Sequence, residues 1–409
     1  MYRLGQEEID AAARVMRAGN VFKTTGPETA DCENLMRGTL GVKHAILMTS
    51  GKAALISALT AMGIGPGDEV IVPGYTYIAS AIAVTAAGAI PVIAEADETL
   101  TLDAADVKRK ISKHTKAIMP VHIQGFPCNM DALCAFGIPV IEDACQADGG
   151  SYKGKRLGTI GAAGALSFNY FKIISAGEGG ALLTNDRKLF ERALIFHDSS
   201  AIAYFGNQLD DITEPQFCGN EYRTNNITAA ILYEQLKKLD GILADLRKNK
   251  KAVQKALASD FKFIPSHDAD GDCCTTLAFR FDTEAEARLF AGEEGVSGWL
   301  PIDTGKHVYT RWTPILQKAG AFHPLMDPFK MSANKNLNHN YSENMCPKTL
   351  EHLSKTVYIA INPDWTEKEI KERISVLKKA KQTDKASGSK ARGIKRDHAS
   401  QKRDGSFGG

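Results

Sequence analysis

The chain has 409 residues, of which 44% are hydrophobic and 24% are charged, a composition typical of a globular protein with a large core and roughly two to four domains. The 50 Lys and Arg residues nearly balance the 48 Asp and Glu residues, and a net charge of +2 argues against a chain whose whole surface binds nucleic acid. The sequence lacks an apolar run of about 18 residues, a signal-peptide pattern and a CxxC pair, so we expect a cytoplasmic protein without a membrane span, a disulfide framework or a metal site.

Short apolar runs alternate with helical patterns through the first part of the chain. Strands are predicted at 45–50, 69–73, 90–97, 116–125 and 138–144, and helices at 52–62 and 79–87. Two further apolar runs, ALSFNYF and GGALLTND, flank a glycine-rich loop. Because continuous apolar strands separated by helices are typical of a parallel sheet buried on both faces, we predict a mostly parallel, doubly wound α/β sheet.

The second part of the chain predicts a smaller α+β domain. It contains a basic helical segment, LRKNKKAVQKAL, an edge strand at 276–282, and two amphipathic helices, TEAEARLFAGEEG and WTEKEIKERISVLKKAK. The last segment, 381–409, has eight Lys or Arg residues against three Asp, and a solvated terminus is a simpler interpretation of it than a nucleic-acid or membrane-surface role. We therefore divide the chain into a large domain (1–244), a small domain (245–380) and a disordered basic tail (381–409).

Four predicted strand ends supply polar or aromatic groups, and ligands of such sheets bind beyond the carboxyl ends of the strands. Thr49-Ser50-Gly51-Lys52 precedes a helix, whose N-terminus either suits a phosphate or is simply capped by Ser50. Asp143 follows Val140-Ile141-Glu142, and its carboxylate could hold a protonated ring nitrogen or cap a helix. Glu142 should point to the opposite face of the sheet.

Lys172 lies beside aromatic residues and before a glycine-rich turn, within SFNYFKIISAGEGG. A desolvated lysine there would be a nucleophile toward an aldehyde, whereas a surface lysine with a packed stem is the plainer interpretation. Tyr77, just past a strand, could stack on a flat ring or be a core or turn residue. The segment Lys306–Trp312 has basic and aromatic groups that suit an acidic sugar, although a surface loop is the simpler interpretation.

The order of SGKAAL, GPGDEVIVPGYTYIAS, VIEDACQADGGSYKGKRLGTIG and SFNYFKIISAGEGGALLTND resembles the DegT/DnrJ/StrS family of sugar aminotransferases. The resemblance runs from about Thr24 to the helix near 366–380, and it implies a fold type I enzyme that uses pyridoxal 5'-phosphate (PLP). The phrases DETLTLD and GEGGALLTND, with the long motif around Asp143, resemble the branch that includes 8-amino-3,8-dideoxy-manno-octulosonate aminotransferase.

The resemblance also implies roles for individual residues. Lys172 matches the lysine that binds the cofactor covalently and moves the proton, and Asp143 matches the carboxylate that faces the pyridine nitrogen. Gln146 matches a residue near the ring, Tyr77 the aromatic residue on its face, and Ser167 a phosphate-binding hydroxyl. The remaining phosphate contacts are implied at Ser50, Gly51, Lys52 and Ala53.

Two positions depart from the family pattern. The family usually has Thr where Lys52 stands. The lysine keeps the charge complementarity with a phosphate but changes the geometry of the contact. The family's G-x-N-x-R, whose Asn reaches the phosphate of the neighbouring subunit, reads Gly219-Asn220-Glu221-Tyr222-Arg223 here. Either Asn220 substitutes for that Asn or the contact is absent, and Lys52 and Glu221 could compensate one another.

The resemblance implies an aminotransferase that moves an amino group from glutamate or glutamine to a keto-sugar used in surface polysaccharide or related amino-sugar biosynthesis, and a homodimer with both active sites at its interface. Related dehydratases carry His in place of the lysine, so Lys172 disfavours dehydration. A non-catalytic PLP- or sugar-binding regulator remains an alternative. The acceptor stays open between a nucleotide-linked and a free acidic sugar, which His197–Ser200 and 207–218 are expected to contact.

Overall fold

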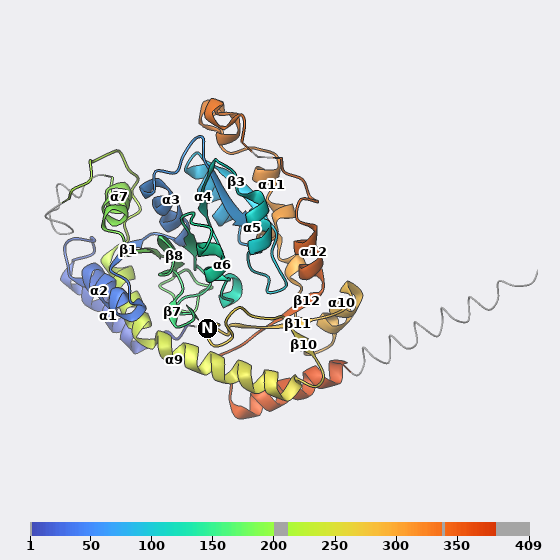
Figure 1. Cartoon of the computed structure of the whole chain (residues 1–409). Helices are drawn as coiled ribbons and strands as arrows, with labels where there is room; N and C mark the ends of the chain where they lie inside the picture. The colour runs from blue at the N-terminus through green and yellow to red at the C-terminus, as the bar shows by residue number, and fades with distance from the viewer. Residues whose placement is uncertain (1, 200–211, 338–339, 382–409) are drawn as a thin grey trace, which may run out of the picture.

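The computed structural model describes residues 2–199, 212–337 and 340–381 (Figure 1). The tail expected at 381–409 lies outside this part of the chain except for Lys381, as do Ser200 and residues 207–211. The strands of the large domain are β1 (His44–Met48), β2 (Glu69–Pro73), β3 (Ile90–Ala94), β4 (Thr115–Ile118), β5 (Ile141–Asp143), β6 (Ser151–Tyr152), β7 (Lys155–Arg156), β8 (Ala163–Ser167) and β9 (Gly180–Thr184). Its helices are α1 (Gln6–Ala18), α2 (Glu28–Leu40), α3 (Gly51–Ala61), α4 (Ala79–Ala86), α5 (Ala104–Lys110), α6 (Met130–Cys134) and α7 (Arg187–His197).

One twisted sheet forms the centre of the large domain. The strands pair as β3-β2-β4 and as β5-β8-β9-β1, and parallel bridges from Ile118 to Val140 and from Val121 to Asp143 join the two groups. β9 is antiparallel to both of its neighbours, while the pairs of β2 with β3, β2 with β4 and β5 with β8 are parallel. Every residue of β2 and β3 is buried, because helices cover both faces. The predicted mostly parallel, doubly wound sheet is confirmed.

The start of α3 is packed tightly against β9. Ser50 is the N-cap residue of α3, and its Oγ accepts a hydrogen bond from the backbone N–H of Ala53 at 3.1 Å. A Cβ at Gly180 would lie 2.2 Å from the carbonyl carbon of Ser50, so only glycine lets β9 approach this closely. The N-terminus of α3 is therefore fixed at the carboxyl end of β1.

The part of the chain predicted to form the small domain contains a three-stranded antiparallel sheet in the order β10 (Lys262–Phe263), β11 (Thr276–Arg280) and β12 (Thr356–Ala360). Segment 276–282 was expected to be an edge strand, and that expectation is wrong, since β11 lies between the other two. The small-domain helices are α10 (Glu284–Gly292), α11 (Thr313–Leu316) and α12 (Pro347–Ser354), and residues 367–381 are also helical. Packed aromatic rings of Phe261, Phe279 and Phe290 form its core.

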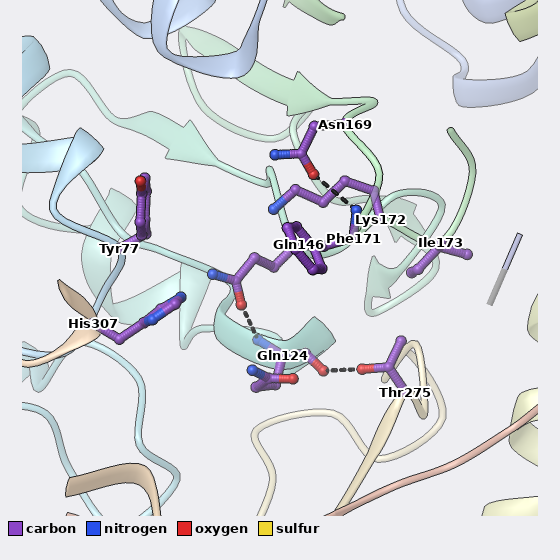
Figure 2. Close-up of a pocket in the computed structure, with 9 residues that line it drawn as sticks. All are labelled: Tyr77, Gln124, Gln146, Asn169, Phe171, Lys172, Ile173, Thr275 and His307. Carbon is purple, nitrogen blue, oxygen red and sulfur yellow. Dashed lines mark hydrogen bonds between the residues drawn. The ribbon is translucent and has the colours of Figure 1, made fainter. Parts of the chain in front are cut away.

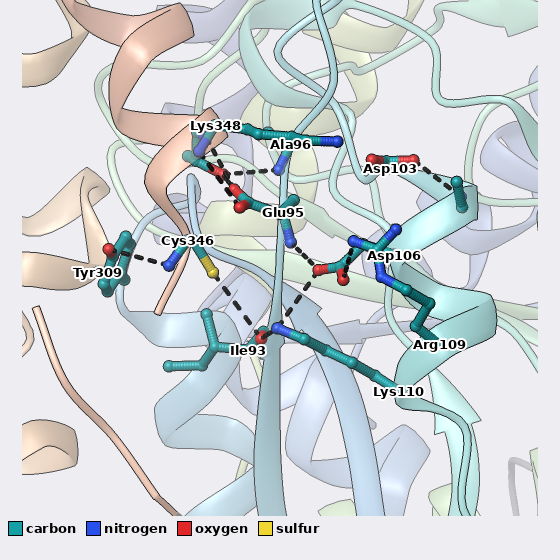
Figure 3. A network of polar contacts seen from close by, with 12 residues as sticks. Ile93, Glu95, Ala96, Asp103, Asp106, Arg109, Lys110, Tyr309, Cys346 and Lys348 are labelled. Atoms are coloured by element: carbon teal, nitrogen blue, oxygen red, sulfur yellow. Dashed lines mark hydrogen bonds and ion pairs between the residues drawn. The ribbon is translucent and has the colours of Figure 1, made fainter. Parts of the chain in front are cut away.

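The carboxylate of Glu95 holds α12 against the end of β3 (Figure 3). It accepts hydrogen bonds from the backbone N–H groups of Lys348 and Thr349, at 3.2 and 2.8 Å, and from the Thr349 hydroxyl at 2.6 Å. These donors lie in the first turn of α12, where a negative charge also suits the helix dipole. Because β12 follows α12 directly, this contact places the small sheet beside the large one.

Helix α9 (Asn226–Leu257) has 32 residues and runs from α1 and α2 to the small domain (Figure 1). At its far end the Lys250 ammonium pairs with the Asp272 carboxylate at 2.5 Å, and both groups are buried. The helix continues without a break through residues 244 and 245, between which the sequence analysis divided the chain. That division into two domains remains a prediction. Among the described residues no helix is both long and apolar enough to cross a membrane.

Candidate active site

Residues from four strand ends line one cavity of about 440 Å³, which we call the inner cavity. Ser50, Gly51 and Lys52 come from the start of α3, Asp143 from the end of β5 and Ser167 from the end of β8. Tyr77, Gln146 and Lys172 also line it. The structure therefore brings together eight of the ten predicted site residues. Ala53 does not line the cavity, although its backbone N–H donates to the Ser50 hydroxyl. Asn220 also lies outside the cavity.

The Asp143 carboxylate is only 5% exposed and is held in place by two donors. Its Oδ2 accepts from the Ser80 hydroxyl at 2.7 Å, and its Oδ1 accepts from the backbone N–H of Cys145 at 3.2 Å. The Ser80 hydroxyl also lies 2.8 Å from that of Thr76. Sequence reasoning missed Ser80 and Thr76, because a hydroxyl in an alanine-rich helix carries no signal of a partner 63 residues away.

Glu142 faces the other side of the sheet, as its position next to Asp143 predicted. Its carboxylate accepts hydrogen bonds from the backbone N–H groups of Gly158, Ile160 and Gly161 at 2.6 to 2.8 Å. Glu142 thus stabilises the turn before β8, while Asp143 is presented to the cavity.

Lys172 joins the inner cavity to a second one of about 420 Å³, which we call the outer cavity (Figure 2). Both cavities are also lined by Tyr77, Gln146 and Asn169, and the outer one continues to Gln124, Thr275 and His307. Tyr77 is 44% exposed and is therefore not a core residue. An amine at the junction of the two cavities can reach a group bound in either.

The segment from Lys306 to Trp312 is not a plain surface loop. Lys306 lines the inner cavity and His307 the outer one, whereas Tyr309 and Trp312 are fully buried. The ring of His307 lies 5.3 Å from that of Tyr77. Burial and the nearby charge of Lys172 lower the pKa of the His307 imidazole below its ordinary value, although a hydrogen bond to the Thr304 carbonyl opposes them. Burial and the Lys172 charge thus both favour the neutral form of the His307 imidazole.

The departures from the family pattern at Asn220 and Glu221 lie away from both cavities. The Glu221 carboxylate pairs with the Arg223 guanidinium at 2.6 Å, and Arg223 also pairs with Asp198. Glu221 therefore has a partner of its own and does not compensate for Lys52 within this chain. The expected contact of Asn220 with a neighbouring subunit remains a prediction.

Asp148 lies just beyond this site and was not singled out from the sequence. It is 1% exposed, and neither of its carboxylate oxygens accepts a hydrogen bond from the described residues. Burial raises the pKa of the Asp148 carboxyl well above its ordinary value, although the charge of Lys172 opposes the effect. When the pKa of a carboxyl is higher in the folded chain than in the unfolded chain, the free energy of unfolding falls as the pH rises above the pKa of the unfolded chain.

We therefore expect Asp148→Asn to raise the free energy of unfolding by on the order of 1–3 kcal/mol at about pH 7, and to have a much smaller effect at about pH 4. Thermal melts at both pH values would measure the difference. Asp10→Asn, which changes an exposed carboxylate of α1, is the matched control. A destabilised variant at pH 7 would contradict the expectation.

The sequence pattern of the DegT/DnrJ/EryC1/StrS aminotransferase family matches residues 3–289. The chain belongs to this family. GDP-perosamine synthase of Caulobacter vibrioides is 46% identical over 230 residues, which span 54% of this chain and 60% of that relative.

Solved structures of aminotransferases share the whole fold. That of the aminotransferase from Psychrobacter cryohalolentis is 26% identical, covers 92% of this chain and 97% of its own, and gives a TM-score of 0.74. That of DesV from S. venezuelae, solved in complex with a ketimine intermediate, is 27% identical, covers 92% and 94%, and gives a TM-score of 0.73. The chain therefore has the fold type I architecture of PLP-dependent DegT/DnrJ/EryC1/StrS aminotransferases.

The inner cavity fits the cofactor of this family, PLP. The N-terminus of α3 with Lys52 offers donors for a phosphate, and the buried Asp143 carboxylate offers an acceptor for a ring N–H. The Lys172 amine offers a group that can bind an aldehyde. All three line the same cavity, so one PLP molecule could contact them together.

Proposed function

We propose that this chain is a PLP-dependent aminotransferase that transfers an amino group from glutamate or glutamine to a keto-sugar. The observation that carries the proposal is the joint placement of Lys172, Asp143 and the start of α3 around one cavity at the carboxyl ends of the strands. The family of the chain supports it. The presence of Lys172, where related dehydratases have His, favours transamination over dehydration.

Bound PLP supplies an aldehyde that captures amines and a ring that withdraws electrons from the substrate carbon. Lys172 Nζ anchors the cofactor and then moves a proton to and from the substrate carbon, a role worth roughly 10²–10⁴-fold in rate. Asp143 holds the proton on the ring nitrogen, and the Ser80 hydroxyl orients that carboxylate. Ser50, Gly51, Lys52, Ala53 and Ser167 would hold the phosphate, while Tyr77 and Gln146 would lie against the ring.

An amino-donor half-reaction tests the proposal directly. The protein loaded with PLP is mixed with glutamate or glutamine, and the absorbance of the cofactor is followed. Conversion of the cofactor to its amine form is expected. No conversion with any amino acid would instead support the regulatory alternative, in which the chain binds PLP or a sugar without catalysis.

Two acceptors are proposed for the second half-reaction. The name of the relative GDP-perosamine synthase suggests a nucleotide-linked keto-sugar. The resemblance to the 8-amino-3,8-dideoxy-manno-octulosonate branch suggests a free acidic sugar, and the Lys306 ammonium at the inner cavity favours an anion. Incubating the amine form of the protein with each keto-sugar, and measuring return of the aldehyde form, would distinguish the two.

We also infer a homodimer in which Asn220 of one subunit reaches the phosphate in the other, since Asn220 is exposed and lies outside the cavities of its own chain. Sedimentation of the protein would give its oligomeric state. A monomer with full activity would contradict this part of the proposal.

Lys52 is the unusual member of the proposed phosphate site, and its side chain is exposed at the edge of the inner cavity. We expect Lys52→Thr to raise the dissociation constant of PLP by about threefold to tenfold, because it removes a full positive charge near the phosphate. Titration of the apoprotein with PLP would measure this, with Lys113→Thr as the control at an exposed position far from the cavity. Unchanged affinity would rule out an essential contact.

A further inference from the structure

Three residues with side-chain amides, Gln124, Gln146 and Asn169, line the outer cavity (Figure 2), and the amide oxygen of each accepts a hydrogen bond from the protein. Gln146 Oε1 accepts from the backbone N–H of Gln124 at 3.0 Å, and Asn169 Oδ1 accepts from that of Phe171 at 3.0 Å. Gln124 Oε1 accepts from the Thr276 hydroxyl at 2.9 Å. In the described part of the chain no acceptor is bonded to any of the three NH₂ groups, so each can donate to a ligand in the cavity that these residues line.

The outer cavity therefore presents donors almost alone. Its lining includes the Lys172 amine in addition to the three amides, and it includes no Asp or Glu. An ionised carboxylate has only acceptor sites and can receive several such donors at once. The chemistry of the lining thus matches a carboxylate better than a cation.

The backbone at Gln124 is held in a costly conformation. Its φ of 52° and ψ of 20° lie in the left-handed region, which non-glycine residues rarely adopt. The Gln124 carbonyl accepts from the Thr275 hydroxyl at 2.7 Å, so two adjacent threonines of the small domain fix both ends of this residue. Such strain persists where the surrounding structure enforces it, and here it places the amide in the wall of the cavity.

We propose that Gln124 is a specificity-determining residue whose Nε2 donates a hydrogen bond to a carboxylate of the substrate, and that Thr276 is a positioning residue that selects which end of the amide faces the cavity. The inference rests on the proposed aminotransferase function and narrows it to carboxylate-bearing substrates in the outer cavity. It assigns the recognition to a contact between the two domains of the chain.

The test uses the PLP-loaded protein with two probes, L-glutamate, which reacts, and glutarate, which has the same two carboxylates but no amine. Gln124→Glu keeps the shape and the acceptor for Thr276 but replaces the NH₂ donor by a negatively charged oxygen. We expect the KM for L-glutamate and the dissociation constant of glutarate to rise by roughly tenfold or more, with a smaller change in kcat. Gln124→Leu, which adds no charge, should weaken both probes in the same direction.

A double-mutant cycle separates positioning from stability. Thr276→Val should raise the same two constants by a few-fold in the wild-type background and should add nothing in the Gln124→Leu background. Thr60→Val, in α3 but away from both cavities, is the control for loss of a threonine hydroxyl. Melting temperatures of all variants would show that each is folded.

Unchanged KM and unchanged glutarate affinity in both Gln124 variants would overturn the inference while leaving the proposed function intact. If the wild-type protein converts no amino acid at all, the proposed function fails instead, and glutarate binding still decides whether Gln124 recognises a carboxylate. Additive losses in Thr276→Val and Gln124→Leu would refute the positioning role of Thr276.

Discussion

Replacing Lys172 by alanine is expected to abolish the visible absorbance of covalently bound cofactor and to lower turnover by at least about 10³-fold. The expectation follows from the position of the amine, which lines both cavities and so is placed to bind the cofactor and to move the substrate proton. A positioned acid–base group alone contributes roughly 10²–10⁴-fold, and loss of the covalent link adds to this. Absorbance spectra after incubation with PLP, and single-turnover rates, would measure both effects.

Lys113→Ala removes an exposed lysine and should leave absorbance and turnover unchanged. The Lys172→Ala variant should also keep the melting temperature of the wild type, because the Lys172 side chain is only half-buried. Turnover within tenfold of wild type in Lys172→Ala would refute the assignment of this lysine.

Asp143→Asn is expected to lower kcat by roughly 10²–10⁴-fold while PLP still binds. A neutral amide has nearly the same shape but cannot keep the ring nitrogen protonated, so the ring withdraws electrons less strongly. The Ser80 hydroxyl would still have an oxygen to donate to, so the fold should persist. Steady-state kinetics and cofactor spectra would separate slower chemistry from weaker binding.

The control for this substitution is Asp131→Asn. It neutralises an exposed carboxylate in α6 that pairs with the Lys153 ammonium. Ser80→Ala should reduce kcat in the same direction as Asp143→Asn but by less, since it disorients the carboxylate without neutralising it. Wild-type kcat in Asp143→Asn would show that this carboxylate does not face the reacting ring.

Much of the large domain could be predicted from the sequence, because its strands are buried on both faces and read as continuous apolar runs. The small sheet was harder. β11 was placed at an edge because its second neighbour, β12, was not predicted from the sequence, although TVYIA is rich in residues that favour strands. A strand's place in a sheet depends on its partner, and the partner here lies 80 residues further along the chain.

The candidate site shows the same contrast between residues that could be predicted from the sequence and residues that could not. Residues at strand ends, such as Asp143 and Ser50, could be singled out because parallel strands bring their carboxyl ends together. Ser80, Gln124 and Thr276 could not, since their roles come from contacts between segments 63 and 152 residues apart. The roles of all these residues await the substitutions described above.

The unbroken course of α9 has a consequence for how this chain can change its length in evolution. One inserted residue would turn everything beyond it by about 100° around the helix axis and advance it by about 1.5 Å. Lys250 would then leave Asp272, and the threonines that follow Asp272 would lose their alignment with Gln124. An insertion that a surface loop would absorb at little cost would here displace one wall of the outer cavity, so the length of α9 is more constrained than the identity of its exposed residues.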